Sequence, residues 1–203
     1  MKKILVFMLA LLIGLPCFAA GLAAGSAFGS GDEEKKIWER SPDDTPLESA
    51  VKEGDIARVE ELIAQGVMVD ELHKGVTPLG LASVLEYGNI VKVLIHKGHA
   101  NVDLKFDNGR TALIQAVFCG KTEIVNILID EGHADVNAQM DGGFTALMWA
   151  SYRGYVAIVK KLIEAKADVN LSTDQGSFTA LSLAQEAGNK DVIKLLKEND
   201  ATK

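Results

Sequence analysis

Histidine, cysteine and carboxylate side chains are the groups of this 203-residue chain that would ligate a metal or act as nucleophiles. The four histidines are spread along the sequence at His73, His96, His99 and His133. A zinc site needs three or four converging ligands, and no group of cysteines and histidines has that spacing. We therefore predict no metal site, and we interpret the histidines as structural residues of loops.

Motifs for nucleophilic or cofactor chemistry are also missing from the sequence. Cys119 has no sequence-adjacent partner that would mark it as a nucleophile. Asp103, Asp135 and Asp168 fall in turns, where a carboxylate accepts hydrogen bonds from backbone N–H groups. There is no Gly-x-Gly-x-x-Gly, no phosphate-binding loop and no Gly-x-Ser-x-Gly. We predict that the protein is not an enzyme and that it binds no cofactor.

The strongest pattern in the sequence is a repeat with a period of 34 residues. Threonine recurs at Thr77, Thr111, Thr145 and Thr179, each followed by a leucine two positions later and an alanine five positions later. A weaker copy begins at Thr45. A period of this length is typical of stacked repeat proteins, which present an extended surface and not a catalytic pocket.

Each copy predicts two short helices and a turn. The hydroxyl of Thr111 would cap the first helix of the third copy, and Gly120 would end that helix. The apolar run over residues 124–129 predicts a second helix, which stops at Gly132. Asp107-Asn108-Gly109 is typical of a turn, because asparagine and glycine tolerate positive φ.

The repeat resembles the ankyrin repeat. The matching strings are TPLGLA (77–82), TALIQA (111–116), TALMWA (145–150), TALSLA (179–184), HADVNA (133–138) and KADVN (166–170). The resemblance implies an all-α solenoid of five helix-turn-helix repeats with β-turn loops over residues 45–203. The expected repeats are 45–76, 77–110, 111–144, 145–178 and 179–203. The sequence departs from the family in lacking its histidine after Pro-Leu, and Glu86 stands where the register predicts glycine.

In the ankyrin family, the turns and the exposed side of the first helices form a concave face that grips partner proteins. The resemblance thus implies a non-catalytic module that binds, scaffolds or inhibits another protein. Aromatic residues and arginine, which are enriched at binding hot spots, concentrate on this face in the third and fourth copies. The predicted protein-binding residues are Phe106, Arg110, Gln115, Phe118, Phe144, Trp149, Tyr152, Arg153 and Phe178. A structural interpretation stands beside this one, in which Trp149 simply packs between first helices.

A second function class stays open from the sequence alone. His99 and His133 occupy the same loop site in successive repeats. They suggest an accessory protein of stress or detoxification that binds a metal or a small molecule.

Residues 1–19 predict a secretory signal peptide, because a basic start is followed by an apolar run and small residues. The alternative is a membrane anchor, since the uncharged stretch before Asp32 is long enough to span a bilayer. Both place the repeats outside the cytoplasm, in the bacterial periplasm or in an extracellular space. Cleavage would remove Cys17 and leave Cys119 as the only thiol. Residues 20–44 predict a flexible linker.

The charge of the chain narrows its partners. The formal net charge of −7 becomes −9 when Lys2 and Lys3 leave with the leader, which contains no acidic residue. Nucleic acid and anionic membrane are disfavoured as partners, because both are bound through basic faces. We expect a monomer that binds another protein.

Overall fold

The computed structural model describes residues 41–73 and 75–201. The predicted leader at 1–19 and residues 20–40 of the predicted linker lie outside the described residues. In chain order the elements are α3 (Pro46–Glu53), α4 (Ile56–Ala64), α5 (Pro78–Val84), α6 (Gly88–His96), the 3₁₀ turn η1 (Asp107–Gly109), α7 (Ala112–Phe118), α8 (Thr122–Asp130), α9 (Ala146–Arg153), α10 (Val156–Glu164), α11 (Ala180–Ala187) and α12 (Lys190–Glu198).

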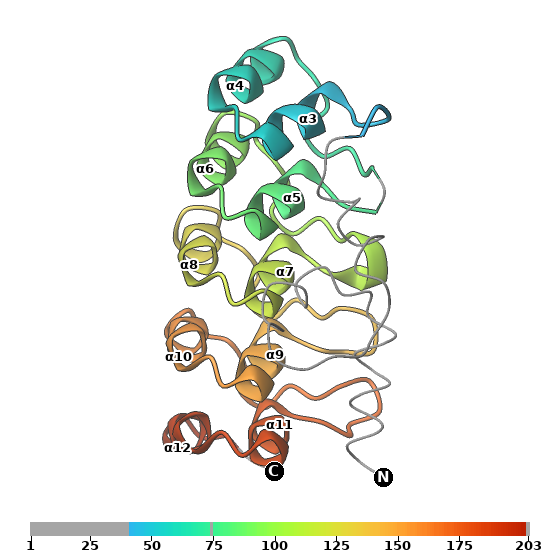
Figure 1. The fold of residues 1–203 in the computed structure, drawn as a ribbon. Helices are drawn as coiled ribbons and strands as arrows, with labels where there is room; N and C mark the ends of the chain where they lie inside the picture. The colour runs from blue at the N-terminus through green and yellow to red at the C-terminus, as the bar shows by residue number, and fades with distance from the viewer. Residues whose placement is uncertain (1–40, 74, 202–203) are drawn as a thin grey trace, which may run out of the picture.

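The described helices stack in two columns, one of first helices and one of second helices (Figure 1). In the first-helix column α7 contacts α5 and α9, and in the second-helix column α8 contacts α6 and α10. The turns between repeats project on the same side of the first-helix column (Figure 1). The prediction of an all-α solenoid is confirmed. Because each repeat contacts its neighbours in sequence, the structure is a one-dimensional stack.

The recurring threonine begins the first helix of every repeat, as predicted. In all five copies its hydroxyl oxygen accepts a hydrogen bond from the backbone N–H three residues later, at distances of 3.0 to 3.4 Å. In the first repeat Glu48 completes a capping box, because its carboxylate accepts the backbone N–H of Thr45. Such a cap satisfies a donor that the first turn leaves free, and it typically contributes about 1 kcal/mol.

In every repeat a residue one or two positions after the first helix adopts a left-handed backbone. Glycine fills this position in four repeats, at Gly54, Gly120, Gly154 and Gly188. In the second repeat the position belongs to Glu86, which has a φ of 61°. A side chain in this conformation costs roughly 1–2 kcal/mol relative to the right-handed one. The repeat geometry is therefore strong enough to hold a non-glycine residue in an unfavourable conformation.

A continuous apolar core lies between the two helix columns. Leucines at equivalent positions of the interior repeats are fully buried in it: Leu79, Leu113, Leu147, Leu94, Leu128 and Leu162. The end repeats place charged residues on their outer sides, where Arg58 and Lys197 are exposed. A terminal repeat needs a polar outer face, because no neighbouring repeat covers it. Charged residues at these positions meet that need.

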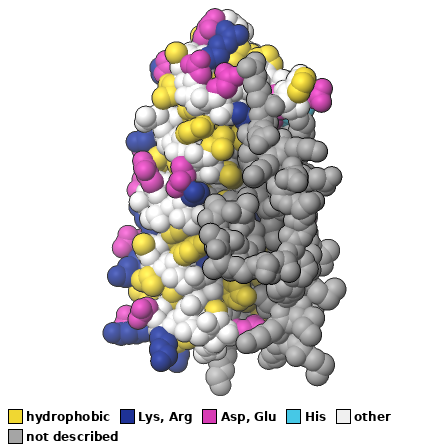
Figure 2. All heavy atoms as spheres, in the orientation of Figure 1, with side chains coloured by type: hydrophobic (Ala, Val, Ile, Leu, Met, Phe, Trp, Pro, Cys, Tyr) yellow, Lys and Arg dark blue, Asp and Glu magenta, His cyan; other side chains and the backbone are white. Residues whose placement is uncertain are grey.

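Ion pairs join the second helices of neighbouring repeats. Lys97 lies 2.8 Å from Glu60, and Lys161 lies 2.6 Å from Asp130. Figure 2 shows basic and acidic side chains along the edge formed by the second-helix column. Exposed pairs of this kind contribute at most about 1 kcal/mol each, so the apolar core supplies most of the stacking energy. Within the described ranges, no helix is both long enough and apolar enough to cross a membrane.

Candidate protein-binding surface

Three of the turns that precede the first helices, before α7, α9 and α11, are joined into a continuous strip. Each turn closes on itself through an isolated backbone bridge. Neighbouring tips are then connected, because Asp141 N–H donates to the Asn108 carbonyl at 3.1 Å and Asp174 N–H donates to the Gly142 carbonyl at 3.2 Å. The residues just before the threonine caps lie on this strip, and three of them are predicted site residues: Arg110, Phe144 and Phe178.

Four predicted site residues form what we call the aromatic row: Phe118, Trp149, Phe144 and Phe178. Phe118 of α7 meets Trp149 of α9 edge to face, with ring centroids 5.1 Å apart and planes at 76°. Phe144, in the turn before α9, lies 5.5 Å from Trp149 and 6.3 Å from Phe178 of the next turn. These separations are those at which aromatic rings attract one another. The row thus connects the third and fourth repeats and ends at the turn before α11.

Phe106 has a different place in the structure. It is buried, and its ring lies against α5 at Gly80, where an added Cβ would come within 3.1 Å of the ring carbon. Gly80 follows Pro78-Leu79 and so occupies the position at which the ankyrin family has its histidine. The small residue therefore makes room for the aromatic ring of the following turn. Phe106 was predicted as a binding residue, but its contact with Gly80 was not, because the two residues are far apart in the chain.

The predicted site is more buried than a simple surface patch. Six of the nine residues are less than 9% exposed: Phe106, Arg110, Gln115, Phe118, Phe144 and Trp149. Tyr152 and Phe178 are half-buried, and Arg153 is exposed. The residues that a partner would reach first are thus Tyr152, Arg153 and Phe178, at the edge of the buried rings.

Two polar groups accompany the aromatic row. The indole Nε1 of Trp149 is buried and has no hydrogen-bond partner among the described residues. A buried donor without an acceptor is unfavourable by roughly 1–3 kcal/mol, so this N–H is available to an acceptor that reaches it. At the end of α9, the Arg153 guanidinium donates to the Tyr155 hydroxyl at 3.2 Å and lies 5.7 Å from its ring centroid. Arg153 is thereby held at the edge of the surface.

A cavity that sequence reasoning missed lies between the turns before α9 and α11. We call it the turn slot. Its volume is about 370 Å³, and its walls include the stacked rings of Phe144 and Phe178. Thr173, Asp174 and Gln175 of the later turn also line it. The signal that would have revealed this slot is the pairing of phenylalanines at equivalent positions in successive turns.

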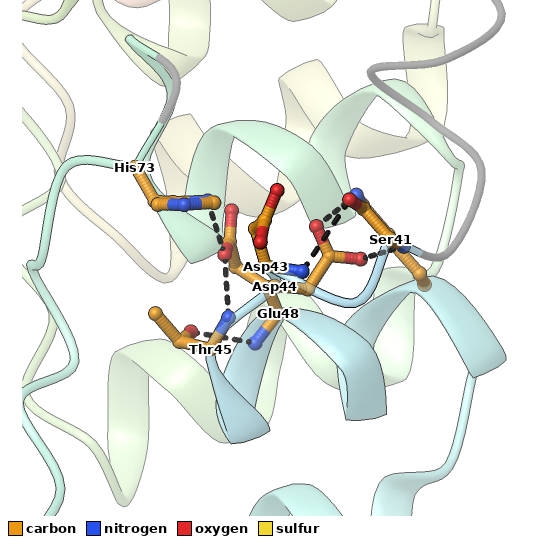
Figure 3. Close-up of polar contacts among 7 residues, drawn as sticks. Ser41, Asp43, Asp44, Thr45, Glu48 and His73 are labelled. Atoms are coloured by element: carbon orange, nitrogen blue, oxygen red, sulfur yellow. Dashed lines mark hydrogen bonds and ion pairs between the residues drawn. The ribbon is translucent and has the colours of Figure 1, made fainter.

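A cluster of two carboxylates and a histidine lies in the first repeat (Figure 3). One ligand atom from each of Asp44, Glu48 and His73 lies within 4.8 Å of the others. The Asp44 carboxylate already contacts the Lys52 ammonium at 2.9 Å and accepts the Ser41 backbone N–H at 2.6 Å. The lysine supplies the positive charge that a metal ion would bring. We interpret the cluster as an ion-pair network that holds the start of α3.

The histidine of this network lies against a buried carboxylate. His73 Nδ1 lies 2.7 Å from Glu48 Oε2, yet no hydrogen bond satisfies that nitrogen by geometry. The Glu48 carboxylate is only 7% exposed and also accepts the Thr45 N–H. His73 thus links the first turn to the helix cap of the first repeat.

His99 and His133, the histidines of the second function class, lie in the turns after α6 and α8. Both are exposed and have a φ of 52°. Within residues 41–73 and 75–201, the one group with metal-ligand proximity is the Asp44 cluster, and neither of these histidines belongs to it. Both histidines hold the same left-handed place in successive loops.

Carboxylates in the turns bind backbone N–H groups, as predicted. Asp135 and Asp168 accept the N–H two residues later, each at 2.9 Å. Asp103 reaches the next repeat and accepts the N–H of Asp135 at 2.9 Å. These carboxylates are therefore structural.

A charged group on the second helices is perturbed for a structural reason. The Lys92 ammonium, through its hydrogen bond, and then the His96 imidazole lower the pKa of the Glu131 carboxyl. Lys92 Nζ lies 2.7 Å and His96 Nε2 lies 2.9 Å from the carboxylate oxygens. Lys92 and His96 belong to α6, and Glu131 follows α8. The contacts of the Glu131 carboxylate therefore tie two neighbouring repeats together.

Cys119 is the C-cap residue of α7. The expectation that cleavage of the leader leaves Cys119 as the only thiol stays a prediction. The one other cysteine of the sequence, Cys17, lies outside the described residues. Cys119 Sγ also lies 3.7 Å from Gln115 Nε2, one helical turn away. Gln115 is therefore engaged within its own helix, at the base of the aromatic row.

Models of known protein families match most of the described repeats. A family model described as ankyrin repeats in three copies matches residues 98–173 and again residues 134–203. A model for the single ankyrin repeat matches residues 74–106. Together the matches extend over residues 74–203, more than half of the 203 residues. Curated proteins give no match to the chain.

Proposed function

We propose that this chain, which belongs to the ankyrin-repeat family, binds one other protein through the aromatic row and the side chains at its edge. Ankyrin repeats are protein–protein interaction modules, and the family is generally a non-catalytic scaffold. The finer proposal concerns the place of binding, the character of the partner and the compartment.

The observation that carries the proposal is the continuity of the aromatic row across the third and fourth repeats. Phe118, Trp149, Phe144 and Phe178 are in successive ring contact. Hot spots of interfaces are enriched in tryptophan, tyrosine and arginine that cluster at desolvated centres. Tyr152 and Arg153 stand at the edge of such a centre, on the last turn of α9. A partner that covers this edge would complete the desolvation of the rings.

The mechanism is recognition by a surface that is already built. The strip of joined turns and the stacked helices fix the positions of these side chains before a partner arrives. A prearranged surface loses little conformational freedom on binding, so more of the contact energy appears as affinity. The formal net charge of −7 favours a partner with a basic face, because complementary charge speeds encounter and excludes wrong partners.

Crosslinking in the host would identify the partner. A photoreactive amino acid is placed at Arg153, and in a matched control at the exposed Lys160 on α10 of the same repeat. We expect one protein to crosslink at position 153 and not at 160. Equal yields at the two positions would contradict the proposed surface.

Purified partner would then test the contribution of the edge side chains. Combined Tyr152→Ala and Arg153→Ala substitutions should raise the Kd about thirtyfold, the effect of losing about 2 kcal/mol at a hot spot. Lys160→Ala with Glu164→Ala, on the exposed side of α10, should leave the Kd unchanged. Circular dichroism of each variant separates lost binding from lost folding. An unchanged Kd for the first pair would refute the assignment.

We further propose that the protein acts outside the cytoplasm as a monomer. The support is the basic, then apolar start of the chain, which is typical of a secretory leader. Sequencing of the mature N-terminus should find it after residue 19 or shortly beyond. A mature chain that starts at Met1 and fractionates with cytoplasmic proteins would contradict export. Light scattering after size exclusion gives the oligomeric state.

A further inference from the structure

We propose that the turn slot binds an arginine side chain of the partner protein, with the guanidinium on Asp174 and the side-chain stem on Phe178. This inference rests on the proposed function and names the chemistry of the partner at one point. The slot is a cavity of about 370 Å³ between the turns that precede α9 and α11.

The walls of the slot are apolar. Phe144 and Phe178 stack with centroids 6.3 Å apart and planes inclined by 27°. Phe144 is buried, whereas Phe178 is half-buried and leaves part of its ring accessible. An accessible ring face attracts a cation at distances up to about 6 Å, and arginine is the cation found there more often.

The rim of the slot carries a carboxylate that lacks a partner within the described ranges. Asp174 is exposed, and no hydrogen bond or ion pair joins its side chain to another described residue. Its backbone N–H, in contrast, is fixed by the carbonyl of Gly142 at 3.2 Å. Asp141, at the tip of the neighbouring turn, is exposed too, and no lysine or arginine lines the slot. The rim therefore has a negative potential that nothing in the described slot neutralises.

The turn that holds the rim is braced by its own hydrogen bonds. The Thr173 hydroxyl accepts the Phe178 N–H at 3.2 Å, and the Thr173 carbonyl accepts the Gly176 N–H at 2.6 Å. Asp174 and Phe178 are thus held on either side of one closed turn. A ligand that contacts both needs little rearrangement of the protein.

These features together select arginine among the side chains of a partner. A purely apolar side chain would cover the rings but leave the carboxylate unpaired. Lysine offers a compact ammonium, whereas the planar guanidinium stacks on a ring and binds a carboxylate in a bidentate fork. Arginine also has an apolar stem that packs on hydrocarbon while its head stays polar. A slot with stacked rings and a lone carboxylate matches that combination.

Three peptides test the inference by NMR titration of the protein as purified: acetyl-Gly-Arg-Gly-amide, its citrulline analogue and its lysine analogue. Citrulline has the shape of arginine without the charge. We expect the arginine peptide to shift the amide signals of Gly142 and Gly176 saturably, and the lysine peptide to bind more weakly. Equal binding of the citrulline peptide, or shifts confined to other repeats, would overturn the inference.

Variants locate the binding within the slot. Asp174→Asn should weaken the arginine peptide about fivefold, the upper range for an exposed ion pair. Phe178→Leu, which keeps an apolar wall, should weaken it about threefold through loss of the ring face. Asp191→Asn, which removes an exposed carboxylate on α12, is the control that should change nothing. If Asp174→Asn binds like the parent protein, the slot is not an arginine site.

Failure here is distinguishable from failure of the proposed function. A protein that ignores the arginine peptide but still crosslinks a partner at position 153 loses only the slot. If the protein binds the peptide yet crosslinks equally at positions 153 and 160, the arginine site in the slot stands and the binding surface at the aromatic row is wrong.

Discussion

The Glu86 carboxylate lies 2.8 Å from the Lys121 ammonium, although Glu86 sits in a left-handed backbone position that glycine fills in the other four repeats. Lys121 follows the first helix of the next repeat and is the N-cap residue of α8. The pair therefore joins two adjacent repeats at the connection between their helices. The ion pair is solvent-exposed, so its energy is smaller than the conformational cost that Glu86 carries.

Glu86→Gly should thus stabilise the protein. Removing the side chain relieves a left-handed residue at a cost of one exposed ion pair, and we expect the free energy of unfolding to rise by about 0.5–1 kcal/mol. Urea denaturation monitored by circular dichroism measures this change. The Lys121→Ala variant breaks the pair but keeps Glu86 in its left-handed conformation. Its change in the free energy of unfolding therefore measures the ion pair separately. A less stable glycine variant would show that the glutamate contributes contacts beyond this pair.

Thr111→Ala should destabilise the third repeat. The hydroxyl of this fully buried threonine caps α7 by accepting the Ile114 N–H at 3.4 Å. Loss of the cap should lower the free energy of unfolding by about 1 kcal/mol. Thr111→Ser keeps the hydroxyl and should recover most of this loss in the same urea titration. If serine is as damaging as alanine, the methyl packing of Thr111 matters more than its cap.

Gly143→Ala should be more damaging than an alanine at another left-handed glycine. Gly143 has a φ of +80°, and an added Cβ would lie 2.5 Å from the Asp174 backbone nitrogen in the next turn. Gly66 has the same φ of +80° with no atom within 4 Å of an added Cβ. Gly66→Ala should cost roughly 1–2 kcal/mol for the backbone alone.

The difference between the two variants measures how tightly the turn tips approach. We expect Gly143→Ala to exceed Gly66→Ala by at least about 1 kcal/mol, because a backbone atom must move to admit the Cβ. Thermal and urea denaturation of both variants provide the comparison. Equal losses would mean that the neighbouring turn moves aside without penalty.

The tie at Glu131 should make stability depend on pH in the acidic range. Lys92, and secondly His96, hold the pKa of this carboxyl below its ordinary value of 4.5 in the folded state. A lowered folded-state pKa adds stability that is complete above the unfolded-state pKa and is lost as pH falls through the folded-state pKa. Glu131→Gln should therefore be less stable than the parent at pH 7.

The stability difference between Glu131→Gln and the parent should shrink as the pH is lowered below 4.5, since the parent carboxyl then becomes protonated. Urea titrations at a series of pH values test this. Glu164→Gln, at an exposed position on α10, is the matched control and should follow the parent at every pH. A difference that stays constant with pH would rule out ionisation of Glu131 as its source.

The fold was predictable because its determinants are local and repeated. A threonine cap, a glycine after the first helix and a leucine at a fixed spacing each act within one repeat, and the period reveals them five times. Even the exception at Glu86 was visible, because the register singles it out.

The candidate site was predictable in membership but not in depth. Register assigns Trp149 and Phe118 to one face of their helices, and the structure brings their rings together. How much of each ring is exposed depends on neighbours from other repeats, which register does not describe. The burial of Phe106 was unpredictable for the same reason. Its ring packs against α5 only because Gly80 has no side chain. The turn slot likewise arises between turns, and no single repeat contains it.

The backbone ties between turn tips have a mechanical consequence. The carbonyls of Asn108 and Gly142 hold the next tip in the chain at hydrogen-bond distance, so three successive tips move together. A load applied to one of them is shared with its neighbours before any helix has to shift. Lengthening a single turn would break these backbone hydrogen bonds. Each turn would then move independently when a partner binds.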